Sequence, residues 1–198
     1  MDGAAIYAIT AIATAIALVV VLHAVEPEFD PSWRMLSEYS LGRFGVLMRV
    51  AFIAAGSGVI AAAVVLGGSA WPANLGLVIV AIGPIGAAFI DTDPVTTPRP
   101  QMSGRSNVHA ALGTLFILGF PIAATILGVV VIGDPSIGPV LAVASLAPWL
   151  ALAWFLRTSI RHAAPDAVGS PEVRIGWPNR VSMVVYVGWV LLAVALAS

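Results

Sequence analysis

The chain has 198 residues, of which 60% are hydrophobic and only 10% are charged, and its mean hydropathy is +1.00. Soluble domains carry about a quarter charged residues, so a soluble fold is excluded because it could not cover this much apolar surface. The formal charge of −1 gives no indication of a nucleic-acid partner, and the absence of cysteine excludes disulfides and thiolate metal sites. We therefore predict an all-α, polytopic integral membrane protein with a single transmembrane domain over residues 1–198.

Six apolar runs are long enough to cross a bilayer as helices, because about 20 residues at 1.5 Å rise per residue span roughly 30 Å of hydrocarbon. They cover roughly residues 4–25, 46–66, 71–90, 107–132, 137–156 and 181–197. The third run is the least secure, since Pro72, Pro84 and several glycines lower its helix propensity. The expected architecture is a compact bundle of six transmembrane helices.

The orientation follows from the basic residues, all nine of which are arginines that lie in or beside the first, third and fifth connections. Cytoplasmic loops carry an excess of basic residues because translocation of positive charge is disfavoured. We therefore expect these three loops in the cytoplasm, and both termini and the turns near Ser69 and Asp134 outside it. The expected location is the bacterial or archaeal cytoplasmic (inner) membrane.

Most ionisable residues, including all three histidines (His23, His109 and His162), fall at the same predicted membrane face. Ionisable groups inside or bordering membrane spans are costly, so they tend to pair or to line a wet cavity. The candidates for binding a ligand or a lipid head group are His23, Ser37, Glu38, Asp91, Asp93, Arg105, His109 and Arg180.

A metal site is one interpretation of this cluster. His23 lies about one turn before the end of the first run, Asp91 ends the third and His109 begins the fourth. Their side chains are therefore expected at one depth, and two imidazoles with a carboxylate suit a divalent metal. The competing interpretation is that both histidines cap helix ends or bind buried carbonyls. It is favoured because the chain has no H-x-x-x-H or H-E-x-x-H spacing. The sequence leaves the cofactor unknown.

The first cytoplasmic loop contains a segment, residues 31–41, that is expected to form a short interfacial helix. Arg34 and Glu38 would then be i, i+4 neighbours, and the default expectation is a solvated surface ion pair worth a few tenths of a kcal/mol. The alternative is that Ser37 and Glu38 fold back over the mouth of the bundle and contact a head group.

Asp91 and Asp93 stand at the predicted end of the third span, where the helix dipole disfavours negative charge. Either a cation such as Arg99 or Arg105 compensates them, or they form Asx turns. The fourth span is expected to begin with Ser106 or Asn107 as its N-cap. Glycines within the spans are expected only to allow close helix approach, and they are Gly56, Gly58, Gly83, Gly86 and Gly113.

Several short motifs follow one another in a characteristic order. They are Ser37-Glu38-Tyr39-Ser40-Leu41-Gly42, Gly45-Val46-Leu47-Met48, Phe89-Ile90-Asp91-Thr92-Asp93-Pro94, Asn107-Val108-His109-Ala110 and Gly176-Trp177-Pro178-Asn179-Arg180. In this order and spacing the chain resembles the bacterial and archaeal membrane family known as domain of unknown function 998. The resemblance implies a compact six-span bundle and supplies no reaction. The layout also resembles intramembrane metal hydrolases that combine a serine, an aspartate and three histidines, but this chain lacks a pair of histidines in its final span.

These observations predict a non-catalytic binding or accessory membrane protein whose cytoplasmic polar cluster receives a lipid head group, a quinone or a partner membrane complex. Expected partners are membrane lipids or a larger membrane-protein complex. One alternative is a metal-dependent hydrolase acting on a lipid, with His23, Asp91 and His109 as ligands and Ser37 or a metal-bound water as nucleophile. The other is a purely structural subunit of a larger membrane assembly.

Overall fold

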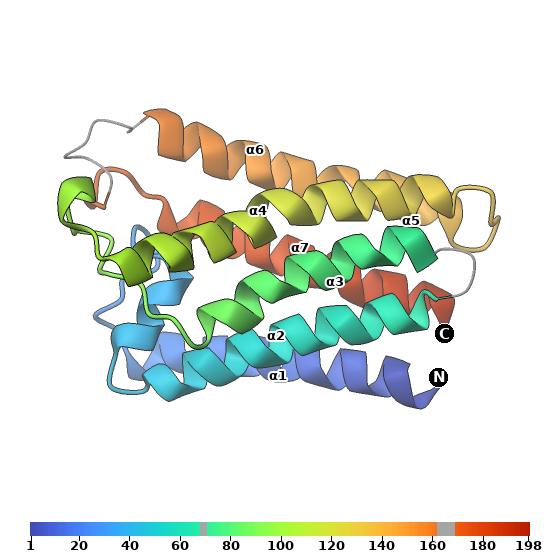
Figure 1. Cartoon of the computed structure of the whole chain (residues 1–198), viewed down its shortest axis with the longest axis horizontal. Coiled ribbons are helices and arrows are strands. Elements are labelled where there is room, and N and C mark those ends of the chain that lie inside the picture. Colours follow the sequence, from blue (N-terminus) through green and yellow to red (C-terminus); the bar gives the residue numbers. More distant parts are fainter. Residues whose placement is uncertain (68–70, 162–168) are drawn as a thin grey trace.

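The computed structural model describes residues 1–67, 71–161 and 169–198, and every regular element within those ranges is helical. The elements in chain order are α1 (Gly3–Val25), η1 (Leu36–Leu41), α2 (Gly45–Val65), α3 (Trp71–Ala87), η3 (Arg99–Gln101), α4 (Gly104–Val130), α5 (Gly138–Ala144), α6 (Leu146–Arg161) and α7 (Gly176–Ala197). Figure 1 shows the long helices side by side, with both termini at one end of the bundle. The prediction of an all-α fold is confirmed.

Five helical segments are long and apolar enough to cross a membrane, namely α1, α2, α4, α5 with α6, and α7. The third predicted span instead forms the shorter α3, whose 17 residues end at Ala87 rather than at Ile90. At 1.5 Å rise per residue this helix extends about 26 Å, a few ångströms less than the roughly 30 Å of a hydrocarbon core. Pro84, which lies inside α3, removes one helical N–H donor near this end.

Other helix boundaries also differ from the predicted ones, and η1 covers only Leu36–Leu41 of the helix expected over residues 31–41. Ser103, rather than Ser106 or Asn107, is the N-cap of α4, and its Oγ accepts from the backbone N–H of Ser106 at 3.1 Å. The fifth predicted span is divided at Ser145, because Pro148 cannot donate to the carbonyl four residues earlier. The last helix begins at Gly176, five residues before the predicted start, so the sequence around Arg180 is helical and not irregular.

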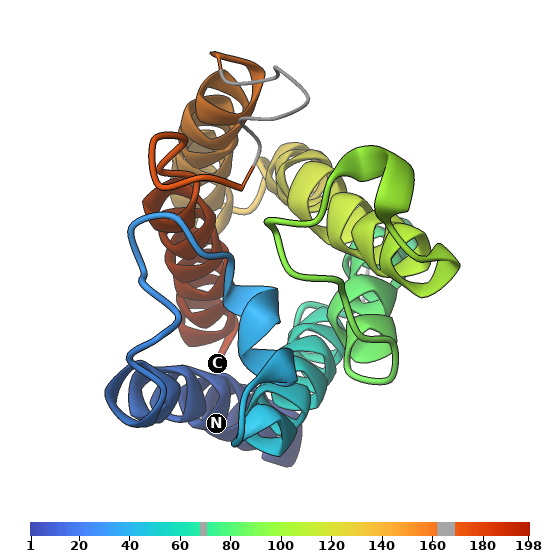
Figure 2. The ribbon, with the colours of Figure 1, turned by 90° about the vertical axis from the view of Figure 1, so that its left-hand side faces the viewer.

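The helices form a closed arrangement around the bundle axis. α1 packs against α2, α2 against α3 and α3 against α4, while α6 packs against both α4 and α7, and α7 returns to α1. Figure 2, seen from the loop end, shows the chain before α2, which includes η1, and the chain between α3 and α4 lying across this end of the bundle. These two segments therefore cover the interior of the bundle at its loop end.

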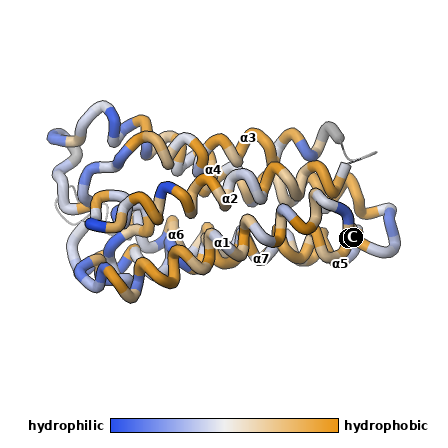
Figure 3. The backbone as a smooth tube through the Cα atoms, turned by 90° about the horizontal axis from the view of Figure 1, so that it is seen from below, coloured by the Kyte–Doolittle hydropathy of each residue, from blue (hydrophilic) through white to orange (hydrophobic). Residues whose placement is uncertain are grey.

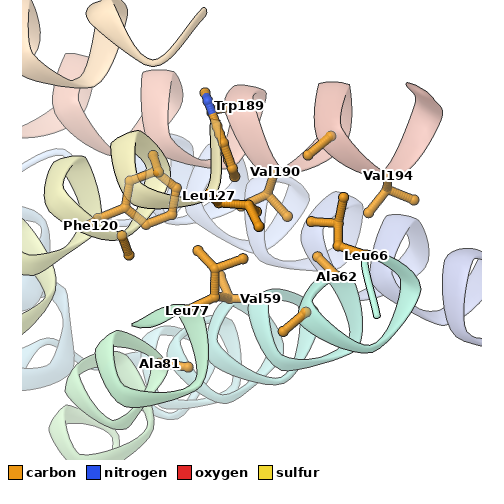
Figure 4. Close-up of a cluster of buried hydrophobic side chains, with 14 of the residues drawn as sticks. Val59, Ala62, Leu66, Leu77, Ala81, Phe120, Leu127, Trp189, Val190 and Val194 are labelled. Carbon is orange, nitrogen blue, oxygen red and sulfur yellow. The ribbon is translucent and has the colours of Figure 1, made fainter. Parts of the chain in front are cut away.

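The half of the bundle nearer the termini has a filled apolar core. Buried side chains from α1, α2, α3, α4, α5 and α7 form one cluster, which includes Val59, Leu77, Phe120, Leu127 and Val190 (Figure 4). Dense packing of this kind fixes the positions of the helices in this half.

Close helix approach accounts for four of the five span glycines. At Gly83, for example, an added Cβ would lie 2.6 Å from the Leu112 carbonyl oxygen and 2.9 Å from Phe116 Cβ, so α3 and α4 need this glycine to pack. Similar crowding exists at Gly56, Gly58 and Gly86. The expectation of close helix approach is wrong for Gly113, where an added Cβ would meet no atom within 4 Å.

The outer surface of the helices is apolar, as lipid contact requires. Large hydrophobic side chains are exposed along every long helix, and they include Val20, Val46, Val64, Leu150 and Val184. Figure 3 shows hydrophilic residues gathered at the loop end and hydrophobic residues along the length of the bundle. This distribution agrees with a membrane-embedded bundle and with one strongly polar end.

Candidate functional site

A cavity of about 980 Å³ occupies the half of the bundle nearer the loops, where the filled core stops. Its lining comes from α1, η1, α2, α3, α4, α6, α7 and the connection between α3 and α4. The walls are mostly apolar, with Ile16, Phe52, Phe116 and Met183 among them. Gly113 also lines this cavity, which explains the open space beside it.

Polar side chains line the cavity at the loop end, and they include His23, Ser37, Glu38, Asp93, Asn107, His109, Asn179 and Arg180. We call this end the cavity mouth. The structure therefore brings six of the predicted site residues to one cavity, while Asp91 and Arg105 are not among its lining residues.

Arg180 is the central cation of the cavity mouth, and only 5% of its surface is exposed. Its Nε donates to His23 Nε2 at 2.8 Å, and its Nη1 donates to the carbonyls of Arg34 at 2.6 Å and Gly176 at 3.2 Å. Its Nη2 is buried and has no hydrogen-bond acceptor among the described residues. The guanidinium thus retains donor capacity in a place that water does not reach freely.

These bonds fix the protonation state of His23. An arginine N–H always donates, so His23 Nε2 must accept and cannot carry a hydrogen. The ring hydrogen therefore lies on Nδ1, which is 2.7 Å from the Val19 carbonyl oxygen and donates to it. His23 is a neutral imidazole with both nitrogens occupied, in agreement with the interpretation that it binds a buried carbonyl.

Glu38 is buried in η1, with 1% of its surface exposed. Its Oε2 accepts from the Met35 N–H and its Oε1 from the Val95 N–H, both at 2.8 Å, and Arg34 Nη2 lies 3.1 Å from Oε1. Burial raises the pKa of this carboxyl, while the two backbone donors and Arg34 act in the opposite direction. The expected i, i+4 ion pair between Arg34 and Glu38 exists. The expectation that it is a solvated surface pair is wrong, because Glu38 is buried where η1 folds back over the bundle.

Side chains of α7 hold η1 in this position. Asn179 Oδ1 accepts from the Leu36 N–H at 3.0 Å, and Arg180 binds the carbonyl of Arg34 just before η1. Tyr39, fully buried in η1, packs its ring against His23 with 5.2 Å between ring centroids. Burial raises the pKa of Tyr39, and the nearby Arg180 lowers it. The segment 34–41 is therefore a fixed cover, which we call the η1 cover.

Asp91 is compensated by an arginine that the sequence analysis did not choose. Arg49 Nη2 of α2 lies 2.7 Å from Asp91 Oδ1, and both side chains are about one third exposed. Arg105 is exposed at the start of α4, and the side chain of Arg99 lies outside the described part of the structure. The expectation of a compensating cation holds, with Arg49 in that role.

Asp93 binds the start of α4. Its carboxylate accepts from the Ser103 N–H at 2.6 Å and from the Ser103 hydroxyl at 3.1 Å, and its own N–H donates to Ser106 Oγ at 3.0 Å. A carboxylate beside a helix N-terminus is electrostatically favourable. Asp93 therefore links the connection after α3 to α4.

The three predicted metal ligands have separate partners. His23 binds Arg180, Asp91 pairs with Arg49, and His109 Nδ1 lies 2.5 Å from the Ile90 carbonyl oxygen. Within residues 1–67, 71–161 and 169–198, no group of three His, Asp or Glu side chains is arranged to hold a metal ion. His162 lies outside the described residues. Within the described residues, the structure therefore does not group His23, Asp91 and His109 at one site.

Two buried polar residues of this end were missed by the sequence analysis. Asn179 is one, although it precedes Arg180 in a quoted motif. The other is Glu26, which is 1% exposed and accepts from the Phe44 N–H at the start of α2. Its Oε2 has no described partner. Its place directly after the first apolar run, before Pro27, was the available signal.

The long apolar helices and the polar end define the class: a helical, multi-pass membrane protein. Residues 9–196 match the family described as Protein of unknown function (DUF998), and because the match covers nearly the whole chain, the protein belongs to that family. The resemblance carried by the sequence motifs is thereby confirmed. Comparison with curated proteins and with solved structures gives no match.

Proposed function

We propose that this protein binds an amphiphilic molecule, with the apolar part in the bundle cavity and the polar head at the cavity mouth. The observation that carries the proposal is the cavity itself, about 980 Å³ with apolar walls and polar residues at one end. Ligand sites in proteins are commonly apolar concavities with a few placed polar groups. A lipid or a quinone has the matching distribution of polarity.

Access from the surrounding lipid supports an amphiphile over a water-soluble ligand. Two side chains of the cavity lining, Val20 and Val184, are 63% and 67% exposed, so the wall of the cavity is not sealed. The η1 cover lies across the loop end and is bonded to α7. An apolar tail can therefore enter through the wall while the head group stays near the membrane surface.

Filling the cavity should abolish binding. In Gly113→Leu the new side chain extends into the cavity, because nothing lies within 4 Å of an added Cβ. The control is Gly188→Leu, which has equal space on α7 but does not line the cavity. We expect Gly113→Leu to lose at least about tenfold in affinity for a pyrene-labelled long-chain fatty acid or its methyl ester, measured by fluorescence in a nonionic detergent.

Native mass spectrometry of the purified protein checks the same point without a chosen probe. A lipid or quinone should co-purify with the parent chain and with Gly188→Leu, and not with Gly113→Leu. The proposal is wrong if the parent chain binds neither probe and carries no such molecule, or if both variants bind equally well.

We further propose that the chain crosses the bacterial or archaeal cytoplasmic membrane six times, with both termini outside the cytoplasm. The support is the arginine-rich loop end and the position of both termini at the opposite end of the bundle (Figure 1). If both termini lie on the same side of the membrane, the number of crossings is even. In this proposal α3 therefore crosses the membrane together with the five longer segments. Local thinning of the bilayer accommodates a short helix at modest cost.

Compartment-specific reporters test this orientation. Reporters joined after Gln101 should be active in the cytoplasm, and those joined after Asp134 or Ser198 should be active outside it. An inverted pattern would overturn the orientation. A tag at Met1 and a reporter at Ser198 on opposite sides would overturn the even number of crossings.

A further inference from the structure

We propose that the bound amphiphile has an anionic head group, a carboxylate or a phosphate, and that Arg180 and Asn179 bind it. This inference rests on the proposed function and specifies the chemical class of the ligand. Its starting point is a buried guanidinium whose charge and donor capacity are incompletely matched by the protein.

Among the described residues, no carboxylate lies within ion-pair distance of Arg180. The ion pairs among the described residues are Arg34 with Glu38 and Arg49 with Asp91. The partners of Arg180 are the neutral imidazole of His23, two backbone carbonyls and the ring of Tyr39, whose centroid lies 5.8 Å from the guanidinium carbon. Its Nη2 has no hydrogen-bond acceptor among the described residues. Glu38 and Asp30 act on this charge only from a distance. A buried charge without a counter-charge in contact is costly, so an anion at this place would relieve the cost.

Asn179 supplies a second donor beside Arg180. Its Oδ1 accepts from the Leu36 N–H, which leaves the two hydrogens of its Nδ2 available, and both Asn179 and Arg180 line the cavity. Hydrogen bonds from a cation to an anionic oxygen are about twice as strong as neutral ones. Two neighbouring donors, one of them charged, favour an anionic oxygen over the ester or keto oxygen of a neutral ligand.

The negative charges at the cavity mouth do not oppose this assignment. Both oxygens of Glu38 accept hydrogen bonds, and Arg34 lies beside one of them. The carboxylate of Asp93 binds Ser103 at the start of α4. Both carboxylates are thus occupied by donors of the protein, whereas Arg180 Nη2 has no acceptor among the described residues.

Probes that differ only in head-group charge or in the alkyl tail measure the contribution of each to binding. The full chain in a nonionic detergent is titrated with a pyrene-labelled C16 fatty acid, its methyl ester, a C16 alkyl phosphate and inorganic phosphate. We expect the acid and the alkyl phosphate to bind roughly 10- to 100-fold more tightly than the ester, which lacks the charge. Inorganic phosphate, which lacks the tail, should not compete at millimolar concentration; competition by it would instead identify a site for the free anion.

Substitutions of Asn179 and Arg180 test whether these side chains cause the preference for the acid over the ester. Asn179→Asp keeps an oxygen for the Leu36 N–H and replaces Nδ2 by a negative oxygen, so it should lose the acid selectively and retain the ester. Arg180→Gln should show the same change, and Arg180→Lys, which keeps the charge, should restore part of the preference. The matched control is Arg105→Gln, an exposed arginine at the same end outside the cavity.

The outcomes distinguish this inference from the proposed function. Equal affinity of acid and ester in the parent chain, with loss of both in Gly113→Leu, would overturn the anionic head group and leave the amphiphile cavity standing. Binding of neither probe would remove both. If Arg180→Gln fails to fold, Asn179→Asp decides alone, and unchanged selectivity in that variant would overturn the inference.

Discussion

Glu38→Gln should lower the free energy of unfolding by about 3–5 kcal/mol, the usual cost of removing one partner of a buried ion pair. Glu38 is 1% exposed, and its two oxygens accept from Met35, Val95 and Arg34. Glutamine keeps the volume but replaces one acceptor oxygen by a donor, so at least one N–H at this place loses its acceptor. Denaturant titration in mixed micelles, followed by circular dichroism, measures the loss.

The matched control is Glu28→Gln, which removes an exposed carboxylate from the same connection between α1 and α2. Exposed substitutions of this kind change stability by about 0.5 kcal/mol or less. A loss below about 1 kcal/mol in Glu38→Gln, similar to that of Glu28→Gln, would contradict the buried and bonded state of Glu38.

Gly176→Ala should displace the η1 cover, even though alanine is the better helix former. An added Cβ at Gly176 would lie 2.8 Å from the Trp33 nitrogen and 2.8 Å from the Arg34 carbonyl oxygen, with Pro31 O closer still. These are backbone atoms, so the whole loop must move and the bond from Arg180 to Arg34 O is strained. Overpacking of this kind costs about 1–3 kcal/mol.

A single cysteine reports this displacement, because the chain contains none. Ser40→Cys is suitable, since Ser40 is 7% exposed and its hydroxyl has no described partner. In this background Gly176→Ala should raise the rate of thiol alkylation roughly 5- to 160-fold, which corresponds to about 1–3 kcal/mol of easier opening. Gly104→Ala at the first residue of α4 is the control, where an added Cβ meets nothing. Equal rates in the two variants would contradict the tight contact at Gly176.

Hydropathy alone was sufficient for the all-α membrane fold, because an apolar run of this length has no other stable state in lipid. It was insufficient for α3, where the helix ends at Ala87 and the sequence continues apolar to Ile90. Apolarity says where lipid is tolerated and not where the helical hydrogen bonds stop. Hydropathy also placed the start of α7 too late. Polar residues such as Asn179 and Arg180 can be helical when other groups of the protein form hydrogen bonds with their side chains.

The gathering of ionisable residues at one end was determined by the sequence, because span parity assigns each connection to an end of the bundle. The partners of those residues were decided only by the tertiary structure. His23 and Arg180 are 157 positions apart, and Glu38 and Val95 are 57 apart. No local spacing encodes such pairs, and the expected trio of His23, Asp91 and His109 is replaced by separate contacts with Arg180, Arg49 and Ile90. Side-chain pairing depends on how the helices rotate and approach one another, and this is set by packing at positions such as Gly83 and Gly176, where the contacts are with distant segments.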